Sequence, residues 1–133
     1  MILLDTQAVV WFTTDSDLLG RRSRRVADQA LDDDRLSIST ISFWELALSV
    51  AKRRLRSIDS ASEVRHLVLS AGIIELPLTG EIAILAAELE GLHADPADRF
   101  IAATAIAHNA MLMTADKRLL RWRHSLRRQN AEL

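Results

Sequence analysis

The amino-acid sequence predicts a three-layer α/β/α domain built on a parallel sheet of four or five strands. Short apolar runs alternate along the chain with longer segments of helical periodicity, and this order indicates parallel strands joined by helical crossovers. The short runs are apolar at successive positions, as expected for strands that helices cover on both faces. The chain has 133 residues, 49% of them hydrophobic, so a single domain over residues 1–133 is expected.

The expected strands and helices follow one another with short connections. Strands are expected at residues 2–4, 36–39, 73–76 and 111–113. Helices are expected at residues 6–12, 17–31, 41–55, 60–71, 79–89 and 96–108, and a last one opens at Asp116. Two helix starts carry capping residues, since Ser60 stands three positions before Glu63 and Asp95 directly precedes Pro96. From about residue 118 the chain is an arginine-rich tail without a convincing strand, so the existence of a fifth strand stays open.

The composition argues against several classes of protein. The chain contains no cysteine, which rules out disulfides, thiolate metal sites and a cysteine nucleophile. Its first apolar run is too short for a signal peptide, and no run approaches the roughly 18 apolar residues of a membrane span. Glycine-rich phosphate loops are missing, and the four histidines show no zinc-ligand spacing. A cytoplasmic protein without a membrane anchor is therefore expected.

Carboxylates stand where the predicted strands end. Asp5 directly follows the first strand, and Asp116 comes shortly after the strand expected at residues 111–113. Asp95 and Asp98 lie at the start of a helix, and Glu45 lies one turn into the helix after the second strand. In open α/β sheets, sites form at the carboxyl ends of the strands, so we expect these side chains to approach one edge of the sheet.

A cluster of such carboxylates would need a cation, because ionised acids in one cleft repel one another. Hard oxygen ligands favour Mg²⁺ or Mn²⁺, and these ions hold phosphates and activate water, which is the chemistry of phosphodiester hydrolysis. Simpler interpretations stand beside this one. Asp95 and Asp116 are placed as helix N-caps, Asp98 suits the helix dipole, and Glu45 could lie on a partly solvated face. Asp5 has no obvious structural task.

Four segments, in order along the chain, resemble the motifs of VapC toxins of the PIN-domain superfamily. They are residues 1–6 (MILLDT), 39–46 (STISFWEL), 93–103 (HADPADRFIAA) and 114–116 (TAD). Each is weak alone, whereas the ordered set over roughly residues 1–120 is specific. The resemblance implies a metal-dependent endoribonuclease that acts as the toxin of a type II toxin–antitoxin pair, commonly on structured RNA such as tRNA. It also implies a homodimer and a cognate VapB-like antitoxin whose tail occupies the active-site groove.

The resemblance further implies which residues form the site. The catalytic set would be Asp5, Glu45, Asp98 and Asp116. Asp5 and Asp98 would be the firmest ligands of Mg²⁺, for which Mn²⁺ can substitute, and Asp116 would complete the metal site. Thr6 and Thr114 would orient water or metal-bound groups through hydrogen bonds. Asp95 would support the site or cap its helix.

Arginine clusters are the expected contacts to RNA, although the net charge of the chain is only −1. The guanidinium group binds phosphate in a bidentate manner, which lysine cannot do. The candidates are Arg53 and Arg54 in the last turn of the third predicted helix, and Arg121 and Arg123 near the end of the chain. The alternative is that these clusters are solvated helix faces and helix ends.

Two other functional classes compete with the nuclease. The first is a PIN fold that binds RNA or protein but has lost catalysis, and the intact carboxylate set argues against it. The second is a phospho-receiver domain, which also has an acidic site on an α/β/α fold. A receiver needs an adjacent acidic pair after its first strand, whereas Asp5 is followed here by Thr6 and Gln7.

Overall fold

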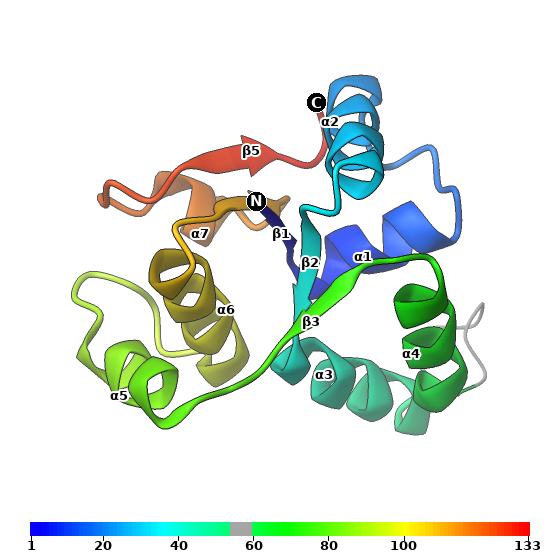
Figure 1. The fold of residues 1–133 in the computed structure, drawn as a ribbon. Coiled ribbons are helices and arrows are strands. Elements are labelled where there is room, and N and C mark those ends of the chain that lie inside the picture. The colour runs from blue at the N-terminus through cyan, green and yellow to red at the C-terminus, as the bar shows by residue number, and fades with distance from the viewer. Residues whose placement is uncertain (54–59) are drawn as a thin grey trace.

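A parallel sheet forms the centre of the computed structural model, which describes residues 1–53 and 60–133. Its five strands are hydrogen-bonded in the order β3-β2-β1-β4-β5, and every neighbouring pair is parallel (Figure 1). The strands are β1 (Ile2–Leu4), β2 (Leu36–Ser39), β3 (Ile74–Leu76), β4 (Met111–Thr114) and β5 (Arg128–Asn130). The predicted fold class is therefore confirmed, and the fifth strand, which the sequence left open, is present.

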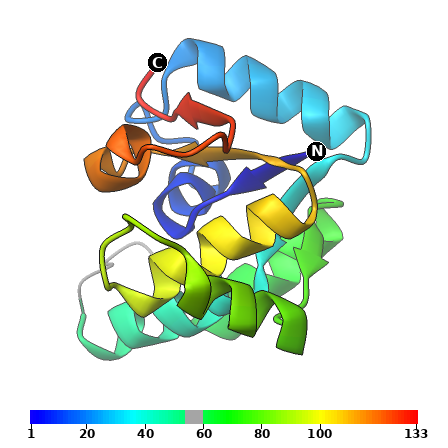
Figure 2. The ribbon, with the colours of Figure 1, turned by 90° about the vertical axis from the view of Figure 1, so that its left-hand side faces the viewer.

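Helices cover both faces of the sheet (Figures 1 and 2). They are α1 (Thr6–Thr13), α2 (Arg21–Asp32), α3 (Thr40–Ala51), α4 (Ala61–Ser70), α5 (Gly80–Glu88), α6 (Pro96–Ala107) and α7 (Lys117–Arg121). Within the described ranges, no helix combines the length and the apolar character needed to cross a membrane.

The side chains of β1 divide the core into two clusters, because successive residues of a strand point to opposite faces. Ile2 and Leu4 pack with residues of α1, α2, α3 and α4. Leu3 packs on the other face, with residues of α6 and α7. The helix α5 lies outside α6, and its Ile82 contacts Ala103 of α6 in a third, smaller cluster. Since β1 is buried on both faces, Asp5, which directly follows it, lies in the interior of the molecule.

The start of α2 differs from the prediction. The sequence predicted a helix from residue 17, whereas α2 begins at Arg21 with Gly20 as its N-cap. The Gly20 N–H donates to the carbonyl of Ala131 at 2.8 Å, and a Cβ added to Gly20 would lie only 2.1 Å from the carbonyl carbon of Leu133. A contact with the far end of the chain therefore fixes where this helix begins, and no local pattern carries that information.

The remaining helix starts lie close to their predicted positions. Ser60, Asp95 and Asp116 are the N-caps of α4, α6 and α7, each accepting a hydrogen bond from a backbone N–H of the first turn. The helix expected at residues 41–55 begins at Thr40 and ends at Ala51. Arg53 follows with a left-handed φ of 54°, and residues 54–59 lie outside the described part of the chain.

The arginine-rich end of the chain packs against the sheet. Trp122 is buried and donates from Nε1 to the Glu90 carbonyl at 2.9 Å. The Arg128 guanidinium donates to four backbone carbonyls, those of Leu119, Trp122, His124 and Leu126, at 2.6 to 2.9 Å. These bonds hold the connection between α7 and β5 and bring β5 against β4. Arg128 is thus occupied within the fold.

We expect Arg128→Lys to lower the free energy of unfolding by about 1–3 kcal/mol, because the single ammonium group of lysine cannot donate to all four carbonyls that the guanidinium binds. Urea denaturation followed by circular dichroism measures the change. Arg123→Lys, at an exposed position five residues away, is the matched control and should change stability by less than about 0.5 kcal/mol. Equal stability of the two variants would contradict this role for Arg128.

Candidate active site

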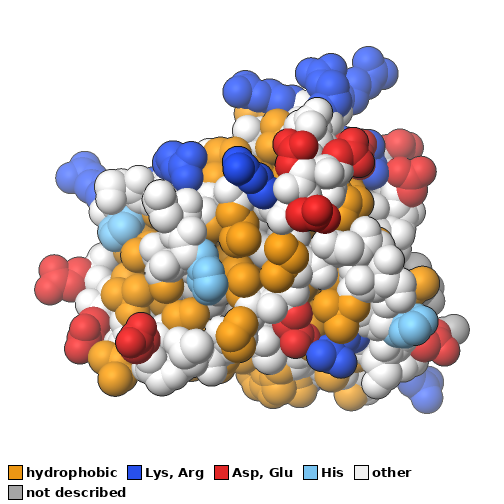
Figure 3. Space-filling view, in the orientation of Figure 1, with side chains coloured by type: hydrophobic (Ala, Val, Ile, Leu, Met, Phe, Trp, Pro, Cys, Tyr) orange, Lys and Arg blue, Asp and Glu red, His pale blue; other side chains and the backbone are white. Residues whose placement is uncertain are grey.

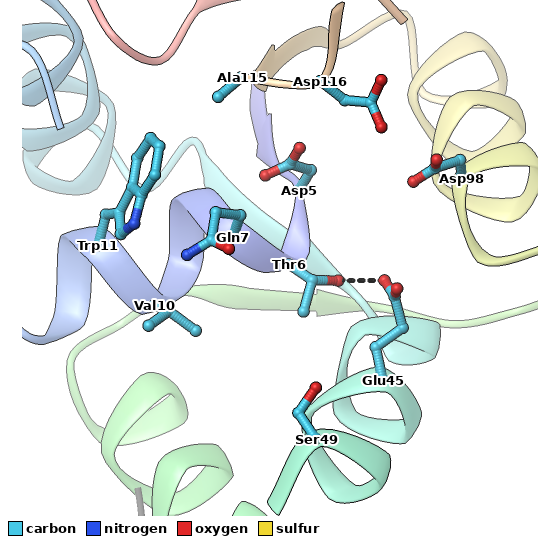
Figure 4. Close-up of a pocket in the computed structure, with 10 residues that line it drawn as sticks. All are labelled: Asp5, Thr6, Gln7, Val10, Trp11, Glu45, Ser49, Asp98, Ala115 and Asp116. Atoms are coloured by element: carbon cyan, nitrogen blue, oxygen red, sulfur yellow. Dashed lines mark hydrogen bonds between the residues drawn. The ribbon is translucent and has the colours of Figure 1, made fainter. Parts of the chain in front are cut away.

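A pocket of about 400 Å³ opens at the carboxyl edge of the sheet. Its walls include all four carboxylates of the predicted catalytic set, namely Asp5, Glu45, Asp98 and Asp116. They come from the end of β1, from α3, from α6 and from the turn after β4, and they gather around one space (Figure 4). Asp95 does not line the pocket and is exposed, and its Oδ1 accepts from the Ala97 N–H at 3.1 Å as an N-cap.

Asp5 is the most buried acid of the pocket, with 6% of its surface exposed. Its Oδ1 accepts from the Ala8 N–H at 2.8 Å, which caps α1, and its Oδ2 accepts from the Thr114 hydroxyl. Burial raises the pKa of Asp5 to about 6, with a smaller contribution from the charges of Asp98 and Glu45, although the two hydrogen bonds oppose the rise. Asp5 is thus held firmly in a place where its charge is costly.

Glu45 reaches the pocket from the second turn of α3, where Thr6 meets it. The Thr6 hydroxyl donates to Glu45 Oε1 (Figure 4). Thr6 Oγ1 also lies 2.9 Å from the hydroxyl of Ser42. Burial raises the pKa of Glu45, and the charges of Asp98 and Asp95 add to the rise, while the bond from Thr6 opposes it. Thr6 and Thr114 were predicted to orient water or bound groups, and in the structure their hydroxyls hold carboxylates.

Asp98 is paired with a histidine that sequence reasoning missed. His93 Nε2 lies 2.7 Å from Asp98 Oδ2, and both side chains are largely buried. Burial raises the pKa of Asp98, the bond to His93 opposes the rise, and the charges of Asp95 and Asp116 add to it. The only hint in the sequence is that His93 stands two residues before the helix cap Asp95, where the chain turns back toward the first turn of α6.

The loop that carries His93 is held by Arg99. Its guanidinium donates to the carbonyls of Leu92 and His93 at 2.8 and 3.2 Å. Further bonds run to Ala86 and Leu89 at the end of α5, at 2.9 and 2.6 Å. Arg99 is therefore a scaffold for the approach to α6 and keeps His93 beside Asp98.

Asp116 differs from the other three acids because a guanidinium group lowers its pKa. Arg118 lies 2.9 Å from Asp116 Oδ2 through its terminal nitrogen, and its backbone N–H donates to Asp116 Oδ1 at 2.7 Å. Burial acts to raise the pKa of Asp116, but the bonds from Arg118 outweigh it and the pKa is lowered. One acid of the pocket is thus readily ionised, while three resist ionisation.

A divalent ion fits the donor atoms of this pocket. Among the described residues, one group of three offers ligand atoms within 4.8 Å of one another, and it consists of His93, Asp98 and Asp116. The predicted metal set shares Asp98 and Asp116 with this group, whereas Asp5 lines the same pocket outside it. Carboxylate oxygens suit Mg²⁺ and Mn²⁺, and a bound cation would offset both the burial of the ionised acids and the repulsion between them, which together raise three of the pKa values.

Of the arginines expected to bind RNA, the three in the described ranges do not line the pocket. Arg53 follows the end of α3, Arg121 is the last residue of α7, and Arg123 comes two residues later; all three are exposed. Arg54 lies outside the described residues. Lys and Arg side chains also gather at the top of the molecule, where α2 lies (Figure 3). Contact of these residues with RNA stays a prediction.

The sequence pattern of the PIN domain matches residues 2–124, which is most of the chain. The chain belongs to the PIN domain family. This PIN domain is 31% identical over 125 residues to "Ribonuclease VapC22" of Mycobacterium tuberculosis, covering 92% of each protein. The resemblance to VapC-type proteins is therefore confirmed.

Solved structures share the fold of this PIN domain. FitAcB from Neisseria gonorrhoeae is 30% identical, with a TM-score of 0.59 over 89% of each chain. VapBC2 from Rickettsia felis, described as bound to a DNA fragment from its promoter, superimposes with a TM-score of 0.72 over 98% of each chain. Its identity is 23%, so this second likeness concerns the fold alone.

We expect Asp5→Asn to stabilise the metal-free protein. Asp5 has a pKa of about 6 when folded and 3.8 as an unperturbed group, so the folded protein holds this proton more tightly than the unfolded chain. The free energy of unfolding is therefore highest below pH 4 and falls as the pH rises through 6. The asparagine cannot ionise, yet it can accept from the Ala8 N–H. Its advantage over wild type should therefore grow between pH 4 and 7, reaching about 1–3 kcal/mol.

Thermal unfolding in a chelator at several pH values measures this difference. Asp28→Asn, on the exposed part of α2, controls for removal of one negative charge. If Asp5→Asn were no more stable than this control at pH 7, the ionised Asp5 carboxylate would carry no cost in the fold.

Proposed function

We propose that this PIN-domain protein is a metal-dependent endoribonuclease and the toxin of a type II toxin–antitoxin pair. The observation that carries the proposal is the pocket at the sheet edge, in which three of four carboxylates have raised pKa values. Proteins arrange acids in this way where a cation or a proton transfer uses them. The relationship to a protein named as a ribonuclease gives the class of reaction.

The metal would be Mg²⁺, with Mn²⁺ as a substitute, held by Asp98 and Asp116 together with Asp5. When bound, such an ion lowers the pKa of water and neutralises charge on a phosphate group. His93 fixes the Asp98 carboxylate by its bond to Oδ2, and Thr114 fixes Asp5 in the same manner. These bonds keep the ligand oxygens in place before any ion arrives, which reduces the cost of organising the site.

Glu45 would act beside the ligands as an acceptor of protons. The pKa of Glu45 is raised toward neutral pH, and this favours proton exchange with a water in the pocket. The Thr6 hydroxyl bonds Oε1 and so sets the direction of the carboxylate. Thr6 and Glu45 together would orient the attacking water toward the phosphate.

The substrate would be RNA in the cytoplasm, with tRNA as the candidate, and arginines outside the pocket would hold its backbone. Arg53, Arg121 and Arg123 are exposed and free to contact phosphates as far as the described residues show, and Arg54 is a further candidate. Binding through such contacts releases counter-ions, so the affinity for RNA would fall with increasing salt.

A VapB-like antitoxin is the proposed protein partner. Similar solved structures include a toxin–antitoxin complex from Klebsiella pneumoniae, with a TM-score of 0.61. A peptide tail from the partner that entered the carboxylate pocket would block access of RNA. The pocket is open to solvent, and its apolar wall of Val10 and Trp11 offers such a tail a surface beside the acids.

We expect Asp98→Asn to reduce RNA cleavage by roughly 100-fold or more, because the change removes charge from a ligand that both His93 and the ion would use. Total RNA is incubated with the purified, antitoxin-free protein and Mg²⁺ or Mn²⁺, and products are resolved by gel electrophoresis. Asp28→Asn, an exposed acid on α2, should cleave like wild type. A chelator should abolish cleavage by both.

Cleavage that persisted in Asp98→Asn would contradict the assignment of the site. If the folded wild-type protein cleaved neither total RNA nor purified tRNA with any metal, the alternative of a catalytically silent binding module would replace the nuclease.

A homodimer is the proposed assembly, and an apolar hollow suggests where it would form. The hollow has a volume of about 290 Å³ and is bounded by α3, Leu78 and the start of α6. Trp44 lines it with 53% of its surface exposed, and Leu48 is exposed one turn further along α3. Exposed aromatic groups in an apolar patch are characteristic of protein–protein interfaces.

We expect Trp44→Arg to shift the protein from dimer to monomer, because it places a charge in this hollow. Light scattering coupled to size-exclusion chromatography measures the mass. Leu67→Arg, at a site on α4 that is 63% exposed, is the control and should leave the mass unchanged. A wild-type monomer, or a dimer that survives Trp44→Arg, would contradict this interface.

A further inference from the structure

A guanidinium group from the chain itself bridges two carboxylates of the proposed metal centre. Arg118 Nε lies 3.3 Å from Asp116 Oδ1, and one terminal nitrogen lies 2.9 Å from Asp116 Oδ2. The same terminal nitrogen lies 3.4 Å from Asp98 Oδ2. The cation thus joins the first turn of α6 to the first turn of α7 and contacts two carboxylates that line the pocket.

The two acids that Arg118 contacts are acids that a divalent ion would use. Asp98 and Asp116 belong to the group of described residues whose ligand atoms lie within 4.8 Å of one another. Asp98 Oδ2 already lies 2.7 Å from His93 Nε2 and 3.4 Å from a terminal nitrogen of Arg118. A divalent ion held by these two carboxylates would lie close to the Arg118 guanidinium, and repulsion between the two cations opposes simultaneous occupation.

The side chain of Arg118 can leave without disturbing the fold. It is 57% exposed. The bond that caps α7 runs from the Arg118 backbone N–H to Asp116 Oδ1, so it does not require the guanidinium. Leu119, the next residue, anchors the helix in the core. The ion pairs are therefore a separable feature of the site.

We propose that Arg118 is a built-in counter-ion of the carboxylate pocket, which a divalent ion must displace in order to bind. This inference rests on the proposed function only in that the pocket binds a metal. In the metal-free protein, Arg118 offsets the repulsion between Asp98 and Asp116. Once displaced, the guanidinium stays beside the pocket and is free to bind a phosphate, so that metal and RNA would assist each other's binding.

The test is a calorimetric titration of Mn²⁺ into metal-free protein. Arg118→Ala should bind Mn²⁺ about three- to tenfold more tightly than wild type, because no guanidinium competes for the two acids. Arg118→Lys keeps the charge but loses the fork, so its dissociation constant should lie between the two. Lys117→Ala is the matched control: it removes one charge from the same helix at an exposed residue that forms no ion pair with any described residue. Its affinity should stay within about twofold of wild type.

Asp98→Asn assigns the titrated site, since Mn²⁺ binding at the pocket should be lost in it. If Arg118→Ala and Lys117→Ala had the same dissociation constant, the counter-ion role would be overturned while the metal centre stood. If the wild-type protein showed no Mn²⁺ binding that Asp98→Asn removes, the metal centre itself would be overturned, and the role of Arg118 with it. Thermal unfolding in chelator verifies that each variant is folded.

Discussion

The buried carboxylate of Asp5 is the constraint on which the arrangement of the pocket depends. It lies at the end of the central strand and caps α1, and it receives the hydroxyl of Thr114 from the neighbouring strand β4. The parallel register, with Leu4 opposite Met113, brings Thr114 to this position. Asp5 is costly to ionise there, so the fold tolerates it only with these bonds and with the other acids arranged around it. A site built on such a residue gives up stability for function.

Arginine has two separate tasks in this protein. Arg99 and Arg128 donate to backbone carbonyls of two connections, one before α6 and one after α7. Their N–H groups satisfy loop carbonyls that would otherwise lack hydrogen-bond partners. Arg118, by contrast, meets side-chain acids and is exposed. Counting arginines in the sequence therefore overstates the number available to bind RNA, because a guanidinium group binds backbone carbonyls of loops as readily as it binds phosphate.

The two kinds of prediction from the sequence fared differently. Features that are written locally were found: the N-caps Ser60, Asp95 and Asp116, and the placement of acids after strands. Features that need distant partners were missed or left open. The start of α2 depends on residues at the far end of the chain, and β5 depends on the carbonyl contacts of Arg128. The pairing of His93 with Asp98 depends on a loop that Arg99 holds.

By itself, the sequence determined the parallel α/β/α class and placed five acids near one edge of the sheet, because strand hydrophobicity, capping and acids at strand ends are short-range patterns. The resemblance to VapC toxins singled out the four of them that share the pocket. Only the tertiary structure decided how those acids differ from one another. Burial raises the pKa of Asp5, Glu45 and Asp98, whereas Arg118 lowers that of Asp116. The reason is physical: desolvation and charge pairing are set by which atoms surround a carboxylate, and those atoms come from segments far apart in the chain.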